Sequence, residues 1–291
     1  MTDLVTITSG VLTAAIDPLG AELTHLRDAD GRELMTDANP AFWTGHAPIL
    51  FPVVGMPFGE TIRVDGTAYP MKKHGFARHA RFDTMRTSDT SVTFALTDSA
   101  DTRASYPFAF RLELTYTLDG ATLDIAARVM NPADAPLPAS FGFHPAFAWP
   151  LPYGQDRGAH RILFDADEPD ALRTIAADGT IAPARKASPL DGRELRLRDD
   201  LFANDALVWD AVRSDGVVYG APAGPRLRIA FPDTPMLGIW TKPGAAYVCV
   251  EPWHGIADPE GYTGDYRAKP GVFEVPARGE KHIGMSVTLE G

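Results

Sequence analysis

The chain has 291 residues, which is long for one domain, although single β-sandwiches and barrels of about 200–250 residues are common. Its 26 glycines and 25 prolines favour many turns and few long helices, which argues against a helical bundle. The formal net charge of −11 repels phosphate backbones and anionic lipids, so we expect no nucleic acid and no membrane surface among its partners.

Cysteine usage and the first residues bear on the cellular compartment. Cys249 is the single cysteine, so no intramolecular disulfide can form and a reducing compartment is expected. The opening MTDLVT lacks the basic and apolar regions of a signal peptide. The longest apolar run, residues 47–59, is too short and too rich in proline to cross a bilayer. We therefore expect a cytoplasmic protein.

Alternating apolar and polar residues predict antiparallel strands along much of the chain. The clearest case is residues 110–118, followed by Asp119-Gly120 and a second alternating run at residues 123–129. Two such runs joined by Asp-Gly predict a β-hairpin with a type I′ turn. Weaker alternation predicts further strands at residues 92–96, 227–231, 236–241, 247–250 and 285–289.

The rest of the chain shows little helical periodicity. Residues 150–200 are the least regular part, and we interpret them as a long excursion over one end of a sheet. No internal repeat, low-complexity linker or domain boundary is visible. These patterns predict an all-β antiparallel sandwich or barrel, with residues 1–291 forming a single domain.

His74 is the first candidate functional residue in chain order. It precedes Gly75 in a segment where the backbone can turn sharply and a ligand can approach closely. Arg78 and Arg81 supply hydrogen-bond donors nearby. A loop histidine that only hydrogen-bonds a backbone carbonyl is the alternative interpretation of the same pattern.

His144 is the second candidate. If its segment is a strand, Phe141 and Phe143 point to one face, while Gly142 and His144 point to the other. The small neighbours of His144 predict a hollow beside it that a ring-shaped substrate can occupy. A core histidine packed against bulky residues from another element is the alternative.

Glu251 is the third candidate, because it ends the apolar run of residues 245–250. A lone charge at the end of a buried strand is costly unless it is paired or used. Pro252 then stops the strand ladder, and Trp253 offers a flat apolar face with one N–H donor. A structural ion pair for Glu251 and a core position for Trp253 are the alternatives.

Other kinds of site lack their usual motifs. No His-x-His pair, no helical i, i+4 histidine pair and no Cys-x-x-Cys occurs, so we expect no metal site. The Gly-x-Ser-x-Gly elbow, the phosphate-binding Walker loop and the dinucleotide-binding strand, Gly-x-Gly-x-x-Gly and helix are also absent. A two-carboxylate glycosidase stays open, since Asp and Glu are plentiful.

Several short motifs, taken together and in order, resemble the aldose 1-epimerase (galactose mutarotase-like) family, and within it the bacterial LacX-like branch. They are Leu50-Phe-Pro-Val-Val-Gly55, His74-Gly-Phe-Ala-Arg78, Phe141-Gly-Phe-His-Pro-Ala-Phe147, Asn204-Asp205 and Val250-Glu-Pro-Trp-His-Gly255. Residues 16–23 and 269–280 also match, so the similarity covers almost the whole chain. The resemblance implies a large antiparallel β-supersandwich that interconverts the α and β anomers of a free sugar, an aldohexose in the first place, without metal or organic cofactor.

The resemblance also implies a role for each candidate residue. Glu251 corresponds to the general base that removes the proton of the C1 hydroxyl, and His144 to the general acid that protonates the ring oxygen. His74 corresponds to the second active-site histidine, which binds the sugar, and Asp205 to the substrate-binding aspartate. Arg78 and Trp253 are further substrate-binding candidates. We expect a monomer or homodimer.

One position departs from the family pattern. Relatives often carry Arg directly after the Pro-x-x-Gly of residues 52–55, where this chain has Met56. The missing cation, with the absence of a positive cluster, favours a neutral sugar over a hexose 6-phosphate. A non-catalytic carbohydrate-binding protein and a hexose-6-phosphate 1-epimerase on the same fold are the two alternatives.

Overall fold

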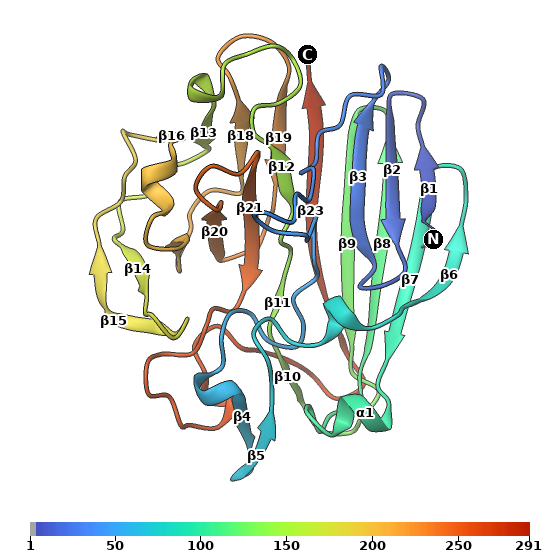
Figure 1. The fold of residues 1–291 in the computed structure, drawn as a ribbon. Coiled ribbons are helices and arrows are strands. Elements are labelled where there is room, and N and C mark those ends of the chain that lie inside the picture. Colours follow the sequence, from blue (N-terminus) through green and yellow to red (C-terminus); the bar gives the residue numbers. More distant parts are fainter. Residues whose placement is uncertain (1–3) are drawn as a thin grey trace.

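The computed structural model describes residues 4–291, without the side chain of Arg86, and consists mainly of antiparallel strands (Figure 1). The strands up to residue 148 are β1 (Val5–Thr8), β2 (Leu12–Asp17), β3 (Glu22–Asp28), β4 (Thr61–Val64), β5 (Thr67–Pro70), β6 (Asp83–Thr87), β7 (Ser91–Thr97), β8 (Arg111–Asp119), β9 (Thr122–Met130), β10 (Leu137–Ala139), β11 (Phe141–Gly142) and β12 (Ala146–Ala148). The later strands are β13 (Arg161–Phe164), β14 (Leu172–Ile175), β15 (Ile181–Lys186), β16 (Glu194–Arg196), β17 (Leu207–Trp209), β18 (Gly216–Gly220), β19 (Arg226–Ala230), β20 (Met236–Trp240), β21 (Tyr247–His254), β22 (Phe273–Val275) and β23 (Glu280–Glu290).

Helical structure is confined to short turns. They are the α-helical turn α1 (Ala100–Arg103) and the 3₁₀ turns η1 (Phe58–Glu60), η2 (Ala77–His79), η3 (Arg157–Ala159), η4 (Asp199–Phe202) and η5 (Tyr266–Ala268). Ser99 and Thr102 cap α1 reciprocally. Among the described residues, no helix has the length and apolar character needed to span a membrane.

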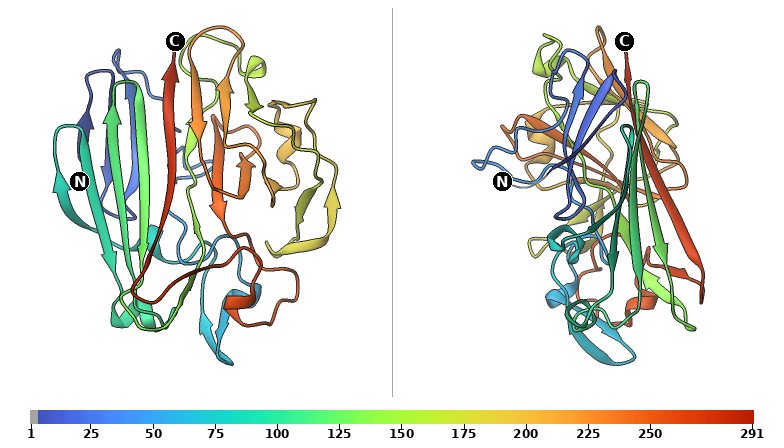
Figure 2. Two further views of the ribbon diagram at one scale, coloured as in Figure 1. Left: turned by 180° about the vertical axis from the view of Figure 1, so that it is seen from behind. Right: turned by 90° about the vertical axis from the view of Figure 1, so that its right-hand side faces the viewer.

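Two large sheets form the framework. The nine-stranded sheet has the order β16-β13-β18-β19-β23-β9-β8-β7-β6, and the seven-stranded sheet has the order β11-β21-β20-β17-β14-β15, with β12 also paired to β21. A three-stranded sheet, β1-β2-β3, and the pairs β10-β22 and β4-β5 complete the fold. Figure 2 shows the nine-stranded sheet as one layer, with β1–β3 and the seven-stranded sheet on the same side of it. The predicted all-β antiparallel sandwich is therefore confirmed.

The layers are held together by apolar side chains and by tyrosine hydroxyls that cross between them. The largest buried cluster contains apolar residues from Ile7 to Val287. Tyr116 of β8 donates a hydrogen bond to the Ala21 carbonyl at 2.6 Å, and Tyr219 of β18 donates one to the Ala148 carbonyl at 2.6 Å. Buried hydroxyls require such partners, so these contacts fix how the smaller sheets sit on the large one.

The predicted hairpin is present, but its turn differs from the expected type. β8 and β9 pair in register from Arg111 opposite Met130 to Asp119 opposite Thr122, which leaves Gly120 and Ala121 as the two turn residues. Gly120 has φ +54°, while Asp119 ends β8 and has no positive φ. A type I′ turn needs a positive φ at both central residues, and in this turn only Gly120 has one. The predicted type I′ turn with Asp119 and Gly120 at its centre was therefore wrong.

The region from 150 to 200 also differs from the expected excursion. Four short strands, β13–β16, extend both sheets in this region. They are brief and interrupted by Gly and Pro, and β14 and β15 are joined by a bulged register. Strands of three to six residues give too little alternation to be recognised in the sequence.

Candidate active site

Strand β21 carries one row of side chains away from the main core. Tyr247, Cys249, Glu251 and Trp253 lie on one face of the strand, and Val248 and Val250 on the other face join the largest apolar cluster. This is the two-residue period of a strand that is covered on both sides. Glu251 is 2% exposed, and it lies opposite Gly238 of β20.

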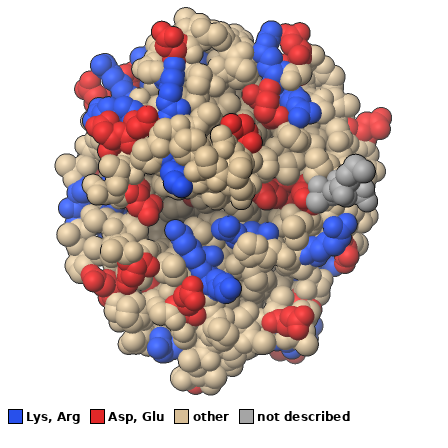
Figure 3. Space-filling view, viewed as in Figure 1, with Lys and Arg blue, Asp and Glu red and all other residues tan. Residues whose placement is uncertain are grey.

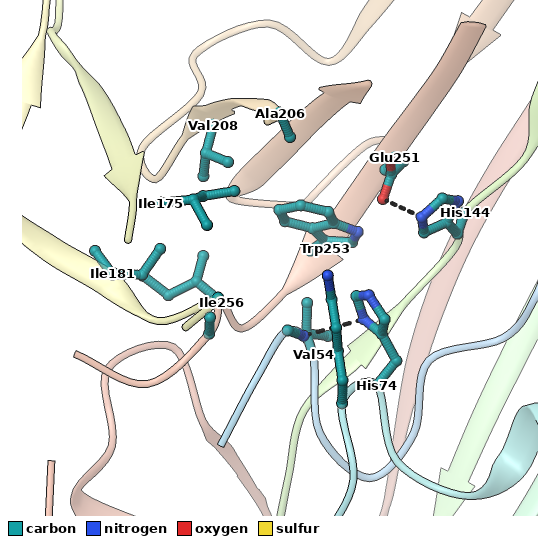
Figure 4. Close-up of a pocket in the computed structure, with 14 residues that line it drawn as sticks. Val54, His74, His144, Ile175, Ile181, Ala206, Val208, Glu251, Trp253 and Ile256 are labelled. Carbon is teal, nitrogen blue, oxygen red and sulfur yellow. Dashed lines mark hydrogen bonds and ion pairs between the residues drawn. The ribbon is translucent and has the colours of Figure 1, made fainter. Parts of the chain in front are cut away.

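His144 reaches Glu251 across the sheet. β11 and β12 both pair with β21, and the register of Gly142 opposite Trp253 and Ala146 opposite Cys249 places His144 opposite Glu251. His144 Nε2 lies 3.1 Å from Glu251 Oε2 (Figure 4). The segment between β11 and β12 also bonds to β21, because the Val250 N–H donates a hydrogen bond to the carbonyl of Pro145. The acid/base candidates are therefore a cross-strand pair.

Burial shifts the titration of both partners. It raises the pKa of the Glu251 carboxyl well above its usual range; the nearby Lys73 opposes this shift and Asp205 adds to it. Burial, together with the nearby Arg78 and Lys73, lowers the pKa of the His144 imidazole to about 3. A pair in such close contact titrates as a unit. Near neutral pH both shifts favour a protonated Glu251 and a neutral His144, so the pair has one transferable proton besides the N–H of the imidazole.

His74 lies next to the pair with a defined tautomer. Its ring centroid is 5.8 Å from that of His144, in an edge-to-face arrangement. The Gly55 N–H donates to His74 Nδ1 at 3.1 Å, so Nδ1 carries no proton. Burial holds the pKa of His74 well below its usual range, and the positive field of nearby groups lowers it too. The neutral ring therefore has its N–H at Nε2, available to a ligand oxygen.

The indole of Trp253 lies in a gap formed by two glycines. A Cβ on Gly142 of β11 would lie 2.5 Å from Trp253 Cδ1, and a Cβ on Gly238 of β20 would lie 2.4 Å from Trp253 Cη2. Space beside His144 was predicted from its small neighbours, but at Gly142 the indole fills that space. Gly142 therefore makes room for the indole, and the substrate ring beside His144 stays a prediction.

Gly238→Ala should push the Trp253 ring out of this gap. We expect a loss of about 1–3 kcal/mol in the free energy of unfolding, since neither the strand backbone nor the packed indole can move freely. Urea unfolding and the near-ultraviolet circular dichroism of tryptophan measure the two effects. Gly284→Ala in β23 is the control, because the nearest atom to its added Cβ lies 3.9 Å away. Equal stability losses in both variants would contradict this account.

The cavity around these residues has two parts. One part, of about 490 Å³, is lined by Glu251, His144, His74 and Trp253, and most of its other lining residues are apolar. The second part, of about 610 Å³, is lined by Trp43, Trp240, Arg78, Lys73, His74 and His144. Lys73, His74 and His144 border both parts. Figure 3 shows lysines and arginines gathered near the middle of the face that Figure 1 presents.

Comparison with known proteins places this site in context. The aldose 1-epimerase family model matches residues 3–204. The chromosomal LacX protein of Lactococcus lactis subsp. lactis is 30% identical over 261 residues, covering 84% of this chain and 86% of LacX. The chain belongs to the aldose 1-epimerase family.

Solved structures from this family have the same fold. A galactose mutarotase related enzyme from Lactobacillus acidophilus is 31% identical, with a TM-score of 0.92 over 99% of this chain and 97% of the other. A galactose mutarotase-like protein from Lactobacillus casei ATCC 334 is 28% identical, with a TM-score of 0.91 over 99% of this chain and 100% of the other. The fold implied by the sequence motifs is therefore the observed fold.

Within this aldose 1-epimerase fold, the six candidate residues take different places. Glu251, His144, His74 and Trp253 line one part of the cavity, and Arg78 lines the other. Asp205 lies outside both linings. It is exposed, with φ +71°, and its carboxylate accepts a hydrogen bond from the N–H of Ala206 at 2.7 Å.

Several lining residues were missed in the sequence. The ring centroid of Trp43 lies 5.1 Å from that of His144, and Trp240 lies 6.0 Å from it. Trp43 stands in a segment with no strand pattern, so only the fold brings it to His144. Lys73 directly precedes His74, and that adjacency was the one available signal.

Cys249 is a further neighbour of the pair. Its thiol lies with ligand atoms of His144 and Glu251 in a group whose members are all within 4.8 Å of one another. Motif spacing could not predict this trio, because Cys249 and Glu251 share a strand face while His144 comes from another strand. Burial and the charge of Glu251 raise the pKa of the thiol.

Proposed function

We propose that the protein is an isomerase that interconverts the α and β anomers of a free sugar. The carrying observation is the 3.1 Å contact between His144 and Glu251 at the wall of a cavity, in a chain of the aldose 1-epimerase family. Ring opening of a hemiacetal needs one group to remove the proton of O1 and another to supply a proton to the ring oxygen. The pair offers both groups with a single shared proton.

In the first step, the transferable proton of the pair moves from one partner to the other. Its transfer from Glu251 to His144 gives a carboxylate facing O1 and an imidazolium facing the ring oxygen. Glu251 then takes the O1 proton as the C1–O5 bond breaks, and His144 protonates O5, which leaves an open-chain aldehyde. Rotation about C1–C2 presents the other carbonyl face, and O5 adds back while both protons return. Each turnover restores the enzyme and changes only the configuration at C1.

The remaining candidates bind the sugar in this proposal. The Nε2–H of neutral His74 donates to the ring oxygen or its neighbour, and Trp253 packs against a C–H face of the ring. Arg78 donates to hydroxyls in the second part of the cavity. Asp205 contacts an outward-facing hydroxyl, which its exposed position allows. We also propose a single domain, active without cofactor, in a cytoplasmic monomer or homodimer.

Magnetisation-exchange NMR or polarimetry tests the proposal directly. Purified protein should equilibrate freshly dissolved anomers of at least one aldose faster than buffer. A rate equal to the buffer blank for every common aldose would contradict the proposal. Arg78 is the single arginine that lines the cavity in residues 4–291, so the alternative of a hexose-6-phosphate 1-epimerase, expected to have two or more, gains no support.

The pH dependence follows from the shared proton. We expect kcat/KM, after subtraction of the buffer rate, to be constant through neutral pH. It should fall in acid as His144, with its lowered pKa of about 3, gains a second proton. It should fall in alkali when the pair loses its proton at the raised pKa of Glu251. A maximum confined between 4.5 and 6.5, the ordinary values for these two groups, would contradict the assignment.

A further inference from the structure

One part of the cavity is unusually apolar for a site that binds free sugars. Besides Glu251, His144, His74 and Lys73, its larger lining side chains are Val54, Ile175, Ile181, Val208, Ile256 and Trp253. Figure 4 shows Ile175, Ile181, Val208 and Ile256 on the side of Trp253 away from His144, and Val54 next to His74. The indole nitrogen is on the edge nearer Glu251, and it has no hydrogen-bond partner among the described residues. This part therefore has an aliphatic side, away from the acid/base pair, whose side chains offer no hydrogen-bond donor.

Met56 adds to this apolar character from behind the wall. Met56 packs against the same cluster, and its Cβ lies 3.2 Å from where a Cβ on Gly179 would be. Gly179 itself lines the cavity. The Met56 side chain thus lies directly behind this part of the wall.

The second part of the cavity shares Lys73, His74 and His144 with the first and has no aliphatic lining residue. Arg78 lies there with Trp43 and Trp240, and the described residues give its half-buried guanidinium no ion pair or hydrogen bond. Lys73 borders both parts. The two parts therefore differ chemically: one suits a hydroxyl-rich edge of a sugar, and the other suits a portion that carries no hydroxyl.

We propose that the apolar part is a subsite for a hydroxyl-free substituent, and that the substrate class is a 6-deoxyhexose, whose C5 bears a methyl group. This rests on the proposed function. A methyl group gains by leaving water for an apolar wall, whereas a hydroxymethyl or phosphate group there loses water without gaining partners. One methylene or hydroxyl in such a pocket changes kcat/KM by about 10–200-fold.

Four sugars that differ only at C5 test the subsite. They are D-xylose, 6-deoxy-D-glucose, D-glucose and D-glucose 6-phosphate, which carry hydrogen, methyl, hydroxymethyl and phosphorylated hydroxymethyl. We expect kcat/KM for 6-deoxyglucose to exceed that for glucose and xylose by about tenfold or more, with the phosphate lowest. Equal or faster turnover of glucose or its phosphate would overturn the proposal, and faster turnover of the phosphate would assign the subsite to an anion held by Lys73.

Binding without chemistry separates this proposal from the proposed function. 1,5-Anhydro-D-glucitol and its 6-deoxy derivative have no anomeric hydroxyl, so they cannot be isomerised, and calorimetry can compare their affinities. Tighter binding of the 6-deoxy compound by about tenfold supports the subsite even if no sugar is turned over. Equal affinities, in a protein that accelerates anomer exchange, would overturn the subsite and leave the proposed function in place.

A substitution in the wall provides the structural check. Val208→Thr keeps the side-chain shape and adds a hydroxyl to the apolar part, so the ratio of kcat/KM for 6-deoxyglucose over glucose should fall several-fold. Val217→Thr in β18 is the matched control, because Val217 is equally buried but belongs to the main core. The ratio does not depend on the folded fraction. An unchanged ratio in Val208→Thr would overturn the proposal.

Discussion

Glu251→Gln should reduce kcat for anomer exchange by about 10²–10⁴-fold, the usual contribution of a positioned acid or base. Glutamine keeps the shape of the side chain but cannot accept the O1 proton. His144→Asn should have an effect of the same order, because the two groups transfer protons in a single step. The double variant should lose little more than either single variant, since removal of one partner already disables the pair.

The rates are measured by magnetisation-exchange NMR on folded protein, with a matched control. Glu168→Gln changes another buried carboxylate, 5% exposed, which accepts hydrogen bonds from the backbone N–H groups of Arg213 and Ser214 and from the Ser214 hydroxyl. It should lower stability without changing kcat. A Glu251→Gln protein that is folded and exchanges anomers at the wild-type rate would rule out Glu251 as the base.

Lys269→Met should lower the free energy of unfolding by about 3–5 kcal/mol, the cost of leaving a buried charge without its partner. Lys269 Nζ lies 2.8 Å from Asp258 Oδ1, with side chains 1% and 4% exposed. Burial lowers the pKa of Lys269, and Asp258 opposes this shift. Without the lysine, the Asp258 carboxylate keeps only its hydrogen bond from the N–H of Phe58.

This ion pair also supports the walls of the cavity. The backbone N–H of Asp258 donates to the Met56 carbonyl at 2.9 Å, and its carbonyl accepts from Ile181 at 2.8 Å. Urea unfolding of Lys269→Met measures the stability loss. Arg278→Met is the control, since its pair with Asp134 is exposed and should contribute less than about 1 kcal/mol. Similar losses of unfolding free energy in Lys269→Met and Arg278→Met would contradict the view that burial makes the Lys269–Asp258 pair important for stability.

The sequence predicted the strands better than it predicted the turns or the packing. One side of β8, β9, β19 and β23 faces solvent, so apolar and polar residues alternate along their sequences and the strands can be recognised there. The type of the turn at Gly120 depends on which residue ends β8, and the pairing of β8 with β9 determines that residue. A hollow was expected beside His144 from its small neighbours, but the space at Gly142 holds Trp253, because an indole distant in the chain packs there.

The acid/base pair was predicted from its motifs, but the reason for its contact lies in the sheet. His144 and Glu251 are more than a hundred residues apart, and only the pairing of β11 and β12 with β21 makes them neighbours. Trp240 reaches His144 through the pairing of β20 with β21, and Trp43 comes from a segment outside the strands. Asp205 was predicted from a short match alone, and the structure places it outside the cavity lining.

Because His144 and Glu251 lie on neighbouring strands, the spacing between these strands sets the distance between the two groups of the proposed reaction. Opposed residues in neighbouring antiparallel strands have Cβ atoms about 4.5–5.5 Å apart, a distance that lets two long side chains meet around one C–O bond. A register slip of one residue would turn His144 toward the core face and bring Phe143 or Pro145 opposite Glu251. If the pair acts as proposed, anomer exchange requires that this edge of the sheet has assembled in register.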